Sequence, residues 1–241
     1  MSSNKTINIL QLYPRDMNIY GDFGNALVIM RRLQWYGYDA NLITYNPGDE
    51  FPSDIDIIVG GGGQDSGQLK IHEDLISIGP KLITLANKGV PMLMICGLYQ
   101  LFGKFFKTAK DEVIEGIELL DIETYGKSKR LIGNVVTKSD EFGFIVGYEN
   151  HSGQTYLGKK VKPLGYIQKG EGNNLEDDHE GARYKNVIAS YMHGSLLPKN
   201  PAIADFLIKT AVIKKYGEFT GEPIDDSLAN LARKSALKRP R

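Results

Sequence analysis

The feature that most constrains the fold is an alternation, over the first hundred residues, of short apolar runs with longer amphipathic segments. Four runs rich in Ile, Leu or Val predict strands, at residues 7–13, 39–45, 55–59 and 91–95. Two segments between them have helical periodicity, at residues 24–36 and 68–88. Strands that alternate with helices are typical of a parallel sheet covered on both faces. We therefore predict an α/β fold built on a doubly wound, mostly parallel sheet.

Shorter apolar runs follow in the middle of the chain, separated by Gly, Asn or Asp, at residues 118–123, 131–137, 143–149, 164–168 and 186–191. This spacing predicts an antiparallel extension of the same sheet. The end is helical again, with Pro201 at the start of one helix and Asp225 near the start of the last. We see no repeat or long linker. We therefore predict a single domain over residues 1–241, with a C-terminal helix and basic tail from about residue 222.

Composition excludes several classes of protein. The 29 basic residues balance 29 acidic ones, which removes the electrostatic reason to expect a nucleic-acid partner. A single Cys excludes a disulfide framework and a Cys-rich zinc site, and it indicates a reducing compartment or a reactive thiol. The apolar runs are far shorter than the roughly 18 residues of a membrane span, and we see no secretory signal. We expect a cytoplasmic protein that acts on small molecules or proteins, without a metal or other cofactor.

The single Cys lies at a position suited to catalysis. Cys96 follows the buried run 91–95 and precedes a predicted helix, and open α/β sheets bind ligands at the carboxyl ends of their strands. A helix N-terminus at this place lowers the pKa of a thiol. The alternative is a buried Cys that serves as a small apolar residue. His193 follows another apolar strand and is expected at the same rim, where an imidazole can exchange protons with the thiol.

Four glycines at residues 60–63 follow the third predicted strand. A loop without Cβ atoms lets backbone N–H groups approach a ligand or an oxyanion closely. A flexible turn and a phosphate loop are the alternatives, although neither nucleotide-binding template fits the sequence. Arg130 opens a later strand, and its guanidinium suits either a carboxylate ligand or an ordinary surface position. The roles of Asp22, Glu149 and His151 stay open.

Several spaced motifs resemble one family. The segment 95–100, which reads Ile-Cys-Gly-Leu-Tyr-Gln, resembles the nucleophile turn of class I glutamine amidotransferases in the cobyric-acid-synthase-like branch. Five further segments are similar to that branch or to one subgroup of it, at residues 12–14, 17–25, 61–65, 148–151 and 191–198. They span nearly the whole chain in the family's order, which makes the resemblance far more specific than any single motif.

The resemblance implies a mechanism. Cys96 would attack the side-chain amide of L-glutamine to give a glutamyl thioester, with His193 as the acid and base. The amide N–H of Gly97 and one from the loop that contains Gly61 and Gly62 would hold the oxyanion. Arg130 would bind the carboxylate of the substrate glutamine. Water would then hydrolyse the thioester.

The resembled subgroup also implies a partner. Its members are glutaminase subunits that form a heterodimer with a Mur-ligase-like, ATP-dependent subunit and amidate the D-glutamate of lipid II. The family's usual His-x-Glu ending is absent, because Gly194 and Ser195 follow His193, so we expect the partner to supply the third catalytic acid. The alternatives are an amidotransferase subunit for another carboxylate, such as a cobyric-acid-type substrate, and a catalytically silent scaffold for a ligase.

Overall fold

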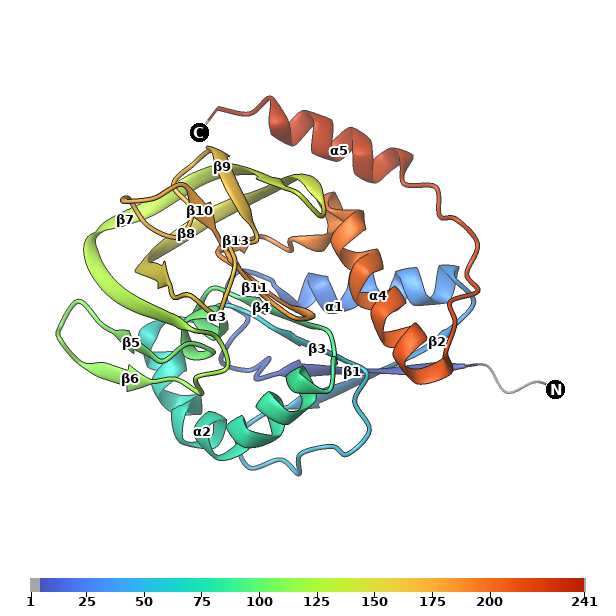
Figure 1. Cartoon of the computed structure of the whole chain (residues 1–241), viewed down its shortest axis with the longest axis horizontal. Helices are drawn as coiled ribbons and strands as arrows, with labels where there is room; N and C mark the ends of the chain where they lie inside the picture. The colour runs from blue at the N-terminus through green and yellow to red at the C-terminus, as the bar shows by residue number, and fades with distance from the viewer. Residues whose placement is uncertain (1–4, 241) are drawn as a thin grey trace.

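The computed structural model describes residues 5–240, and its central layer is a six-stranded sheet in the order β11-β12-β4-β3-β1-β2 (Figure 1). Its strands are β1 (Thr6–Leu12), β2 (Asp39–Tyr45), β3 (Ile57–Gly60), β4 (Met92–Ile95), β11 (Ala182–Tyr184) and β12 (Val187–Ser190). Neighbouring strands are parallel except for β11 and β12 at one edge. Every residue of β3, β4 and β12 is buried, as a parallel sheet covered on both faces requires.

Helices cover both sides of this sheet. Helices α1 (Phe23–Trp35) and α4 (Pro201–Tyr216) contact each other on one side, and α2 (Asp65–Asn87) lies on the other (Figure 1). Apolar residues three or four positions apart give α1 its buried face, namely Ala26, Ile29 and Leu33. The predicted doubly wound α/β fold is therefore confirmed, and the predicted helices 24–36 and 68–88 correspond to α1 and α2.

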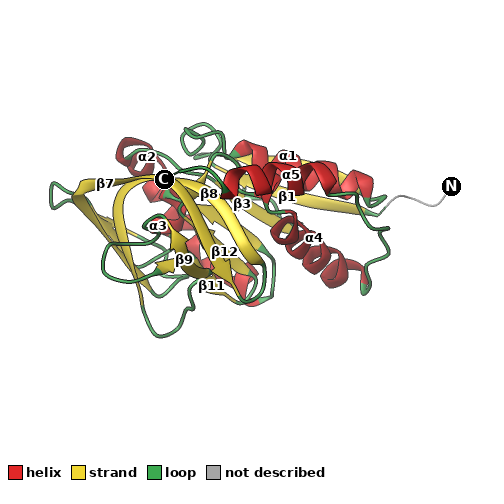
Figure 2. Ribbon diagram, turned by 90° about the horizontal axis from the view of Figure 1, so that it is seen from above, coloured by secondary structure: helices red, strands yellow, loops and turns green. Residues whose placement is uncertain are grey.

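The strands expected to extend the first sheet form a second sheet instead. Only β11 extends the first sheet, as an antiparallel edge strand beside β12. The second sheet contains β5 (Phe105–Lys107), β6 (Val113–Glu115), β7 (Ile122–Ser139), β8 (Gly143–Leu157), β9 (Gly165–Lys169), β10 (His179–Glu180) and β13 (Met192–His193). Figure 2 shows its long strands gathered at one end of the molecule. A register shift between Gly126 and Leu131 interrupts the long β7–β8 hairpin, and irregularities of this kind bend a strand and increase its twist.

The chain crosses between the two sheets at Tyr191. Strand β12 ends at Ser190 in the first sheet, and β13 begins at Met192 in the second, where it pairs with β8. The carbonyl of Ser190 accepts a hydrogen bond of 2.9 Å from the amide of Cys96. This crossing therefore brings His193 to the carboxyl end of β4.

Three short or peripheral helices complete the described chain, α3 (Gly97–Leu101), the 3₁₀ helix η1 (Leu197–Lys199) and α5 (Ser227–Leu237). Helix α5 lies on the surface, and none of its residues is fully buried. Within residues 5–240, no helix combines the length and apolar character needed to cross a lipid bilayer.

Candidate active site

Cys96 occupies a sharp turn between strand β4 and helix α3. Its backbone φ is +48° with ψ −102°, a conformation that a residue with a side chain seldom adopts. The turn is held on both sides, because the Cys96 amide donates to Ser190 and the Cys96 carbonyl accepts from the amide of Gln100 at 3.0 Å. Strain of this kind persists only where the surroundings impose it, and it is common at active sites. The turn has the strand-to-helix geometry of a nucleophile elbow.

His193 meets Cys96 across the backbone of Gly62. A Cβ atom built on Gly62 would lie 2.6 Å from Cε1 of His193 and 3.1 Å from Cβ of Cys96, so the three residues are in close contact. Burial lowers the pKa of His193, but the charge of Cys96 and the interaction with the carboxylate of Asp22 outweigh it and raise the pKa to about 10. The pairing with Cys96 and Asp22 therefore favours the protonated imidazole. The structure brings the two residues together at the rim, as the sequence predicts.

Asp22 supplies a carboxylate from the same chain. It lies immediately before α1 and is buried, with Oδ2 at 3.5 Å from Nδ1 of His193. The same Oδ2 accepts a hydrogen bond of 2.9 Å from the amide of Gly62. The resemblance implies that this acid comes from a partner, because no carboxylate stands two residues after His193. Asp22 is a candidate from the sequence, in the segment 17–25, but with its role left open.

The glycine loop is packed too tightly for any side chain. A Cβ on Gly61 would clash with the Met17 carbonyl and come within 2.9 Å of Cβ of Asp22, and one on Gly63 would lie 2.9 Å from the carbonyl of Asp16. The amide of Gly62 already donates to Asp22, so it is not free to hold an oxyanion as expected from the sequence.

Three other amides remain available for an oxyanion. Among the described residues, the backbone amides of Gly61, Gly63 and Gly97 donate no hydrogen bond. Gly63 also approaches the nucleophile turn, since its nitrogen would lie 3.1 Å from a Cβ built on Gly97. Gly63 is therefore the loop residue whose amide is best placed to act with that of Gly97.

A cleft of about 380 Å³ opens beside Cys96, and its walls include Tyr20, Gln100, Arg130, Asn150 and His151. Arg130 is exposed and faces this cleft. Its Nε donates to Oδ1 of Asn150 at 2.6 Å, and one terminal nitrogen donates to the hydroxyl of Tyr20 at 3.0 Å. Arg130 therefore holds a fixed orientation toward the cleft, which suits a bound carboxylate.

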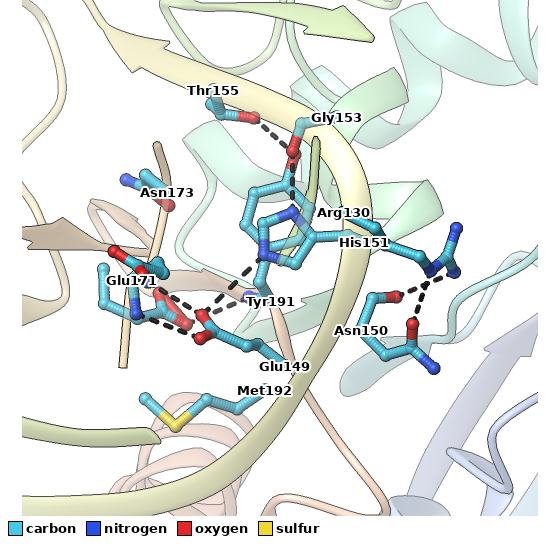
Figure 3. Close-up of polar contacts among 12 residues, drawn as sticks. Arg130, Glu149, Asn150, His151, Gly153, Thr155, Glu171, Asn173, Tyr191 and Met192 are labelled. Carbon is cyan, nitrogen blue, oxygen red and sulfur yellow. Dashed lines mark hydrogen bonds and ion pairs between the residues drawn. The ribbon is translucent and has the colours of Figure 1, made fainter. Parts of the chain in front are cut away.

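His151 is excluded as the catalytic base by its surroundings. Figure 3 shows its ring lying on the ring of Tyr191, with 3.6 Å between centroids and 6° between planes. Burial lowers the pKa of His151 to about 3, although a hydrogen bond of 2.7 Å from Nδ1 to the carbonyl of Gly153 opposes this shift. His151 is therefore neutral, and its role is to support the wall of the cleft.

Glu149 lies on the same face of β8 as His151, whereas Asn150 and Arg130 point to the opposite side of the strand (Figure 3). The Glu149 carboxylate is fully buried and accepts hydrogen bonds from the amides of Glu171 and Gly172, at 3.0 and 2.8 Å. It therefore ties the segment after β9 to β8 and does not reach the cleft. Among residues 5–240, no group of three or more His, Cys, Asp or Glu side chains could hold a metal ion.

Comparison with known proteins places this geometry in a family context. The chain matches the family model of the CobB/CobQ-like glutamine amidotransferase domain over residues 8–201. It is 37% identical over 224 residues to the lipid II isoglutaminyl synthase (glutamine-hydrolyzing) subunit GatD of Staphylococcus aureus (strain N315), a match that covers 92% of this chain and 91% of that protein. It is 38% identical over 216 residues to the subunit of the same name from Streptococcus pneumoniae (strain ATCC BAA-255 / R6), covering 88% of this chain and 83% of that protein.

A solved structure shares the fold. A glutamine amidotransferase from Thermotoga maritima matches with a TM-score of 0.56 at 16% sequence identity, covering 95% of this chain and 93% of the other. At this level of identity the likeness concerns the arrangement of helices and strands alone.

Proposed function

The chain belongs to the CobB/CobQ-like glutamine amidotransferase family, and on that premise we propose that it is the glutamine-hydrolysing subunit of a lipid II isoglutaminyl synthase. The observation that carries the proposal is the meeting of Cys96, at a strained strand-to-helix turn, with the buried His193. The two relatives named GatD support the choice of acceptor, since each is matched over more than four-fifths of its length.

The reaction begins with attack by the Cys96 sulfur on the side-chain amide carbon of L-glutamine. The S–C bond forms, and negative charge on the carbonyl oxygen is held by the amides of Gly97 and Gly63. His193 then gives its proton to the departing nitrogen, so that the C–N bond breaks, ammonia leaves and a glutamyl thioester remains. His193 next takes a proton from water, which attacks the thioester and releases glutamate and Cys96.

Arg130 binds the α-carboxylate of the glutamine at the mouth of the cleft. Its planar guanidinium can donate two parallel hydrogen bonds to a carboxylate, and Asn150 and Tyr20 fix its orientation. The substrate's amide then extends from Arg130 toward Cys96, since both residues line the same cleft.

The partner is a Mur-ligase-like subunit of the MurT type, with which this chain forms a heterodimer. That subunit uses ATP to activate the D-glutamate carboxyl of lipid II, and ammonia released at Cys96 converts it to the amide. Both relatives are named as a subunit of the synthase, which supports a division of labour between two chains.

The test follows the amide nitrogen from glutamine to lipid II. The chain is incubated with amide-¹⁵N glutamine, alone and with the ligase subunit from the same cells, ATP and lipid II. We expect ammonia release from glutamine and, in the complete mixture, ¹⁵N in D-isoglutamine by mass spectrometry. The isosteric variant Cys96→Ser is the control and should lose at least about 100-fold in both.

Two results would contradict the proposal at different points. No ammonia from the wild-type chain, with or without the ligase subunit, would exclude glutaminase activity. Ammonia release without transfer of label to lipid II would retain the glutaminase and exclude this acceptor, in favour of another carboxylate.

A further inference from the structure

The carboxylate of Asp22 is buried at the junction of the base and the glycine loop. Its Oδ2 lies 3.5 Å from Nδ1 of His193 and 2.9 Å from the amide nitrogen of Gly62, and both ionisable side chains are 2% exposed. The other oxygen, Oδ1, is buried and without a hydrogen-bond partner within the described chain. A buried carboxylate is costly unless it is paired or hydrogen-bonded. The contacts with His193 and Gly62 therefore offset the cost of burying Asp22.

The backbone around Asp22 is fastened to the backbone that follows His193. Ser195 Oγ donates a hydrogen bond of 2.9 Å to the carbonyl of Gly21, and the amide of Leu197 donates one of 3.0 Å to Oδ1 of Asn25. These two bonds lie on either side of Asp22 in one segment and beyond His193 in the other. The distance between the carboxylate and the imidazole is therefore set by the fold and not by free rotation of two surface side chains.

Tyr20 closes the same contact from the side of the cleft. Its ring centroid lies 4.2 Å from that of His193, and its hydroxyl accepts from Arg130. With Asp22 on one side and Tyr20 against its ring, His193 has little freedom to turn away from Cys96. Both Tyr20 and Asp22 come from the loop between β1 and α1.

We propose that Asp22 is the positioning residue for His193, so that this chain carries its own acid for the Cys96–His193 pair. The proposal rests on the proposed glutaminase function and deepens it. Asp22 holds Nδ1–H of His193 and leaves Nε2 for the sulfur and the leaving nitrogen, the tautomer and orientation that general acid–base catalysis requires. The hydrogen bond that Asp22 accepts from Gly62 fixes the loop that bears the Gly63 amide, so one carboxylate aligns both the base and the oxyanion donor.

The contact of 3.5 Å is an ion-pair distance rather than a hydrogen bond. Catalytic contacts of this kind are often long before reaction and shorten in the reacting complex. The remaining titratable groups around His193 are Tyr20 from the same loop as Asp22, Cys96 after β4, His151 of β8 and Glu180 of β10. Among the acids of residues 5–240, Asp22 alone lies within ion-pair distance of the His193 ring.

The test is the variant Asp22→Asn in the full chain. Asparagine keeps an oxygen that can accept from Gly62 and removes only the negative charge, so the fold should be retained. We expect kcat for glutamine hydrolysis to fall by about 100-fold while KM changes less than about 3-fold, because Arg130 still binds the substrate. The matched control is Asp16→Asn, since Asp16 lies in the same loop and pairs only with exposed Lys70, at 3.4 Å.

Two further measurements separate positioning from a merely structural role. The alkaline limb of the kcat/KM profile should move to lower pH in Asp22→Asn, because loss of a carboxylate weakens the imidazolium. NMR titration of the four histidine rings, with His193→Gln to assign the signal, should show the same fall for His193. Both should stay at the wild-type position in Asp16→Asn.

The proposal is overturned if kcat falls less than about 10-fold, or if it falls while the His193 titration and alkaline limb stay in place. Recovery of wild-type kcat by Asp22→Asn on addition of the ligase subunit would also overturn it, by assigning the acid to the partner. The NMR titration does not depend on glutamine hydrolysis. A lowered His193 pKa in a chain that releases no ammonia would therefore retain the Asp22–His193 coupling and exclude only the proposed function.

Discussion

At the scale of single residues, the site depends on the lack of a side chain at Gly62. Gly62 packs against both Cys96 and the ring of His193, and no space remains there for a methyl group. The same glycine donates its amide to Asp22. A residue without a side chain therefore sets the distance between nucleophile and base, which neither of those two residues could do alone.

The variant Gly62→Ala tests this role. Its new methyl group would lie 2.6 Å from His193 and 3.1 Å from Cys96, so the two side chains must separate. We expect glutaminase activity to fall by more than about 100-fold, since small misplacements of catalytic groups cost this much. The cost in unfolding free energy should be about 1–3 kcal/mol, as for other overpacked sites. Ammonia release and urea denaturation measure the two effects.

Gly143→Ala is the control for that variant. Gly143 has a positive φ of +67° at the β7–β8 turn, and a Cβ there would meet no atom within 4 Å. Alanine at this position should cost about 1 kcal/mol through backbone strain and leave glutaminase activity unchanged. Equal activities for Gly62→Ala and Gly143→Ala would show that Gly62 does not control the Cys96–His193 contact.

At the scale of elements, the site is assembled where the first sheet passes into the second. Glu180 of β10 joins them, because its Oε1 accepts from Oγ of Ser190 at 2.6 Å and from the amide of Tyr191 at 3.0 Å. Its side chain is completely buried. This carboxyl group therefore fixes the crossing that delivers His193 to the end of β4.

Glu180 makes stability depend on pH. Burial raises its pKa from the ordinary 4.5 to about 7, although the bonds from Ser190 and Tyr191 oppose the shift. The folded chain then binds more protons than the unfolded chain between these values, so the contribution is complete below pH 4.5 and is lost as pH rises through about 7. We expect Glu180→Gln to remove a decline of roughly 3 kcal/mol across this window. Thermal unfolding between pH 5 and about 8 measures it, with exposed Glu115→Gln as the control. Parallel curves for wild type and Glu180→Gln would contradict this expectation.

The sequence predicts elements better than the contacts between them. Alternating apolar runs identify β1 to β4 and helices α1 and α2, because strand and helix periods are local properties. The elbow at Cys96 follows from the same pattern. Neither the second sheet nor the Asp22–His193 contact could be predicted in this way, since both depend on pairing between segments far apart in the chain. Asp22 and His193 are 171 positions apart in the sequence, so no local pattern links the acid before α1 to the histidine.

At the scale of the whole molecule, one arginine fastens the C-terminal helix to the rest. Arg32 of α1 is 4% exposed and pairs with Asp205 of α4 at 2.7 Å and with Asp226 before α5 at 2.6 Å. Helix α5 buries no residue completely, and this ion pair holds its start while Lys169 donates to the carbonyls of Leu237 and Arg239 at its end. The carboxylates overcome the effect of burial and raise the pKa of Arg32 further above its ordinary value, which keeps the guanidinium charged.

The last prediction concerns this attachment. Asp226→Asn removes one of the two carboxylates paired with the buried Arg32. It should lower the free energy of unfolding by about 1–3 kcal/mol, enough to free α5 locally while Asp205 keeps Arg32 paired. We expect a glutamate-specific protease to cut faster at Glu218 and Glu222, which lie in the irregular segment before α5.

Asp225→Asn is the matched control, since Asp225 is exposed and asparagine can still accept from the amide of Ser227. Glutaminase activity should persist in both variants, because Cys96, His193 and Asp22 are held by other elements. Cleavage of Asp226→Asn at the wild-type rate would show that α5 is anchored mainly by packing against η1 and β8.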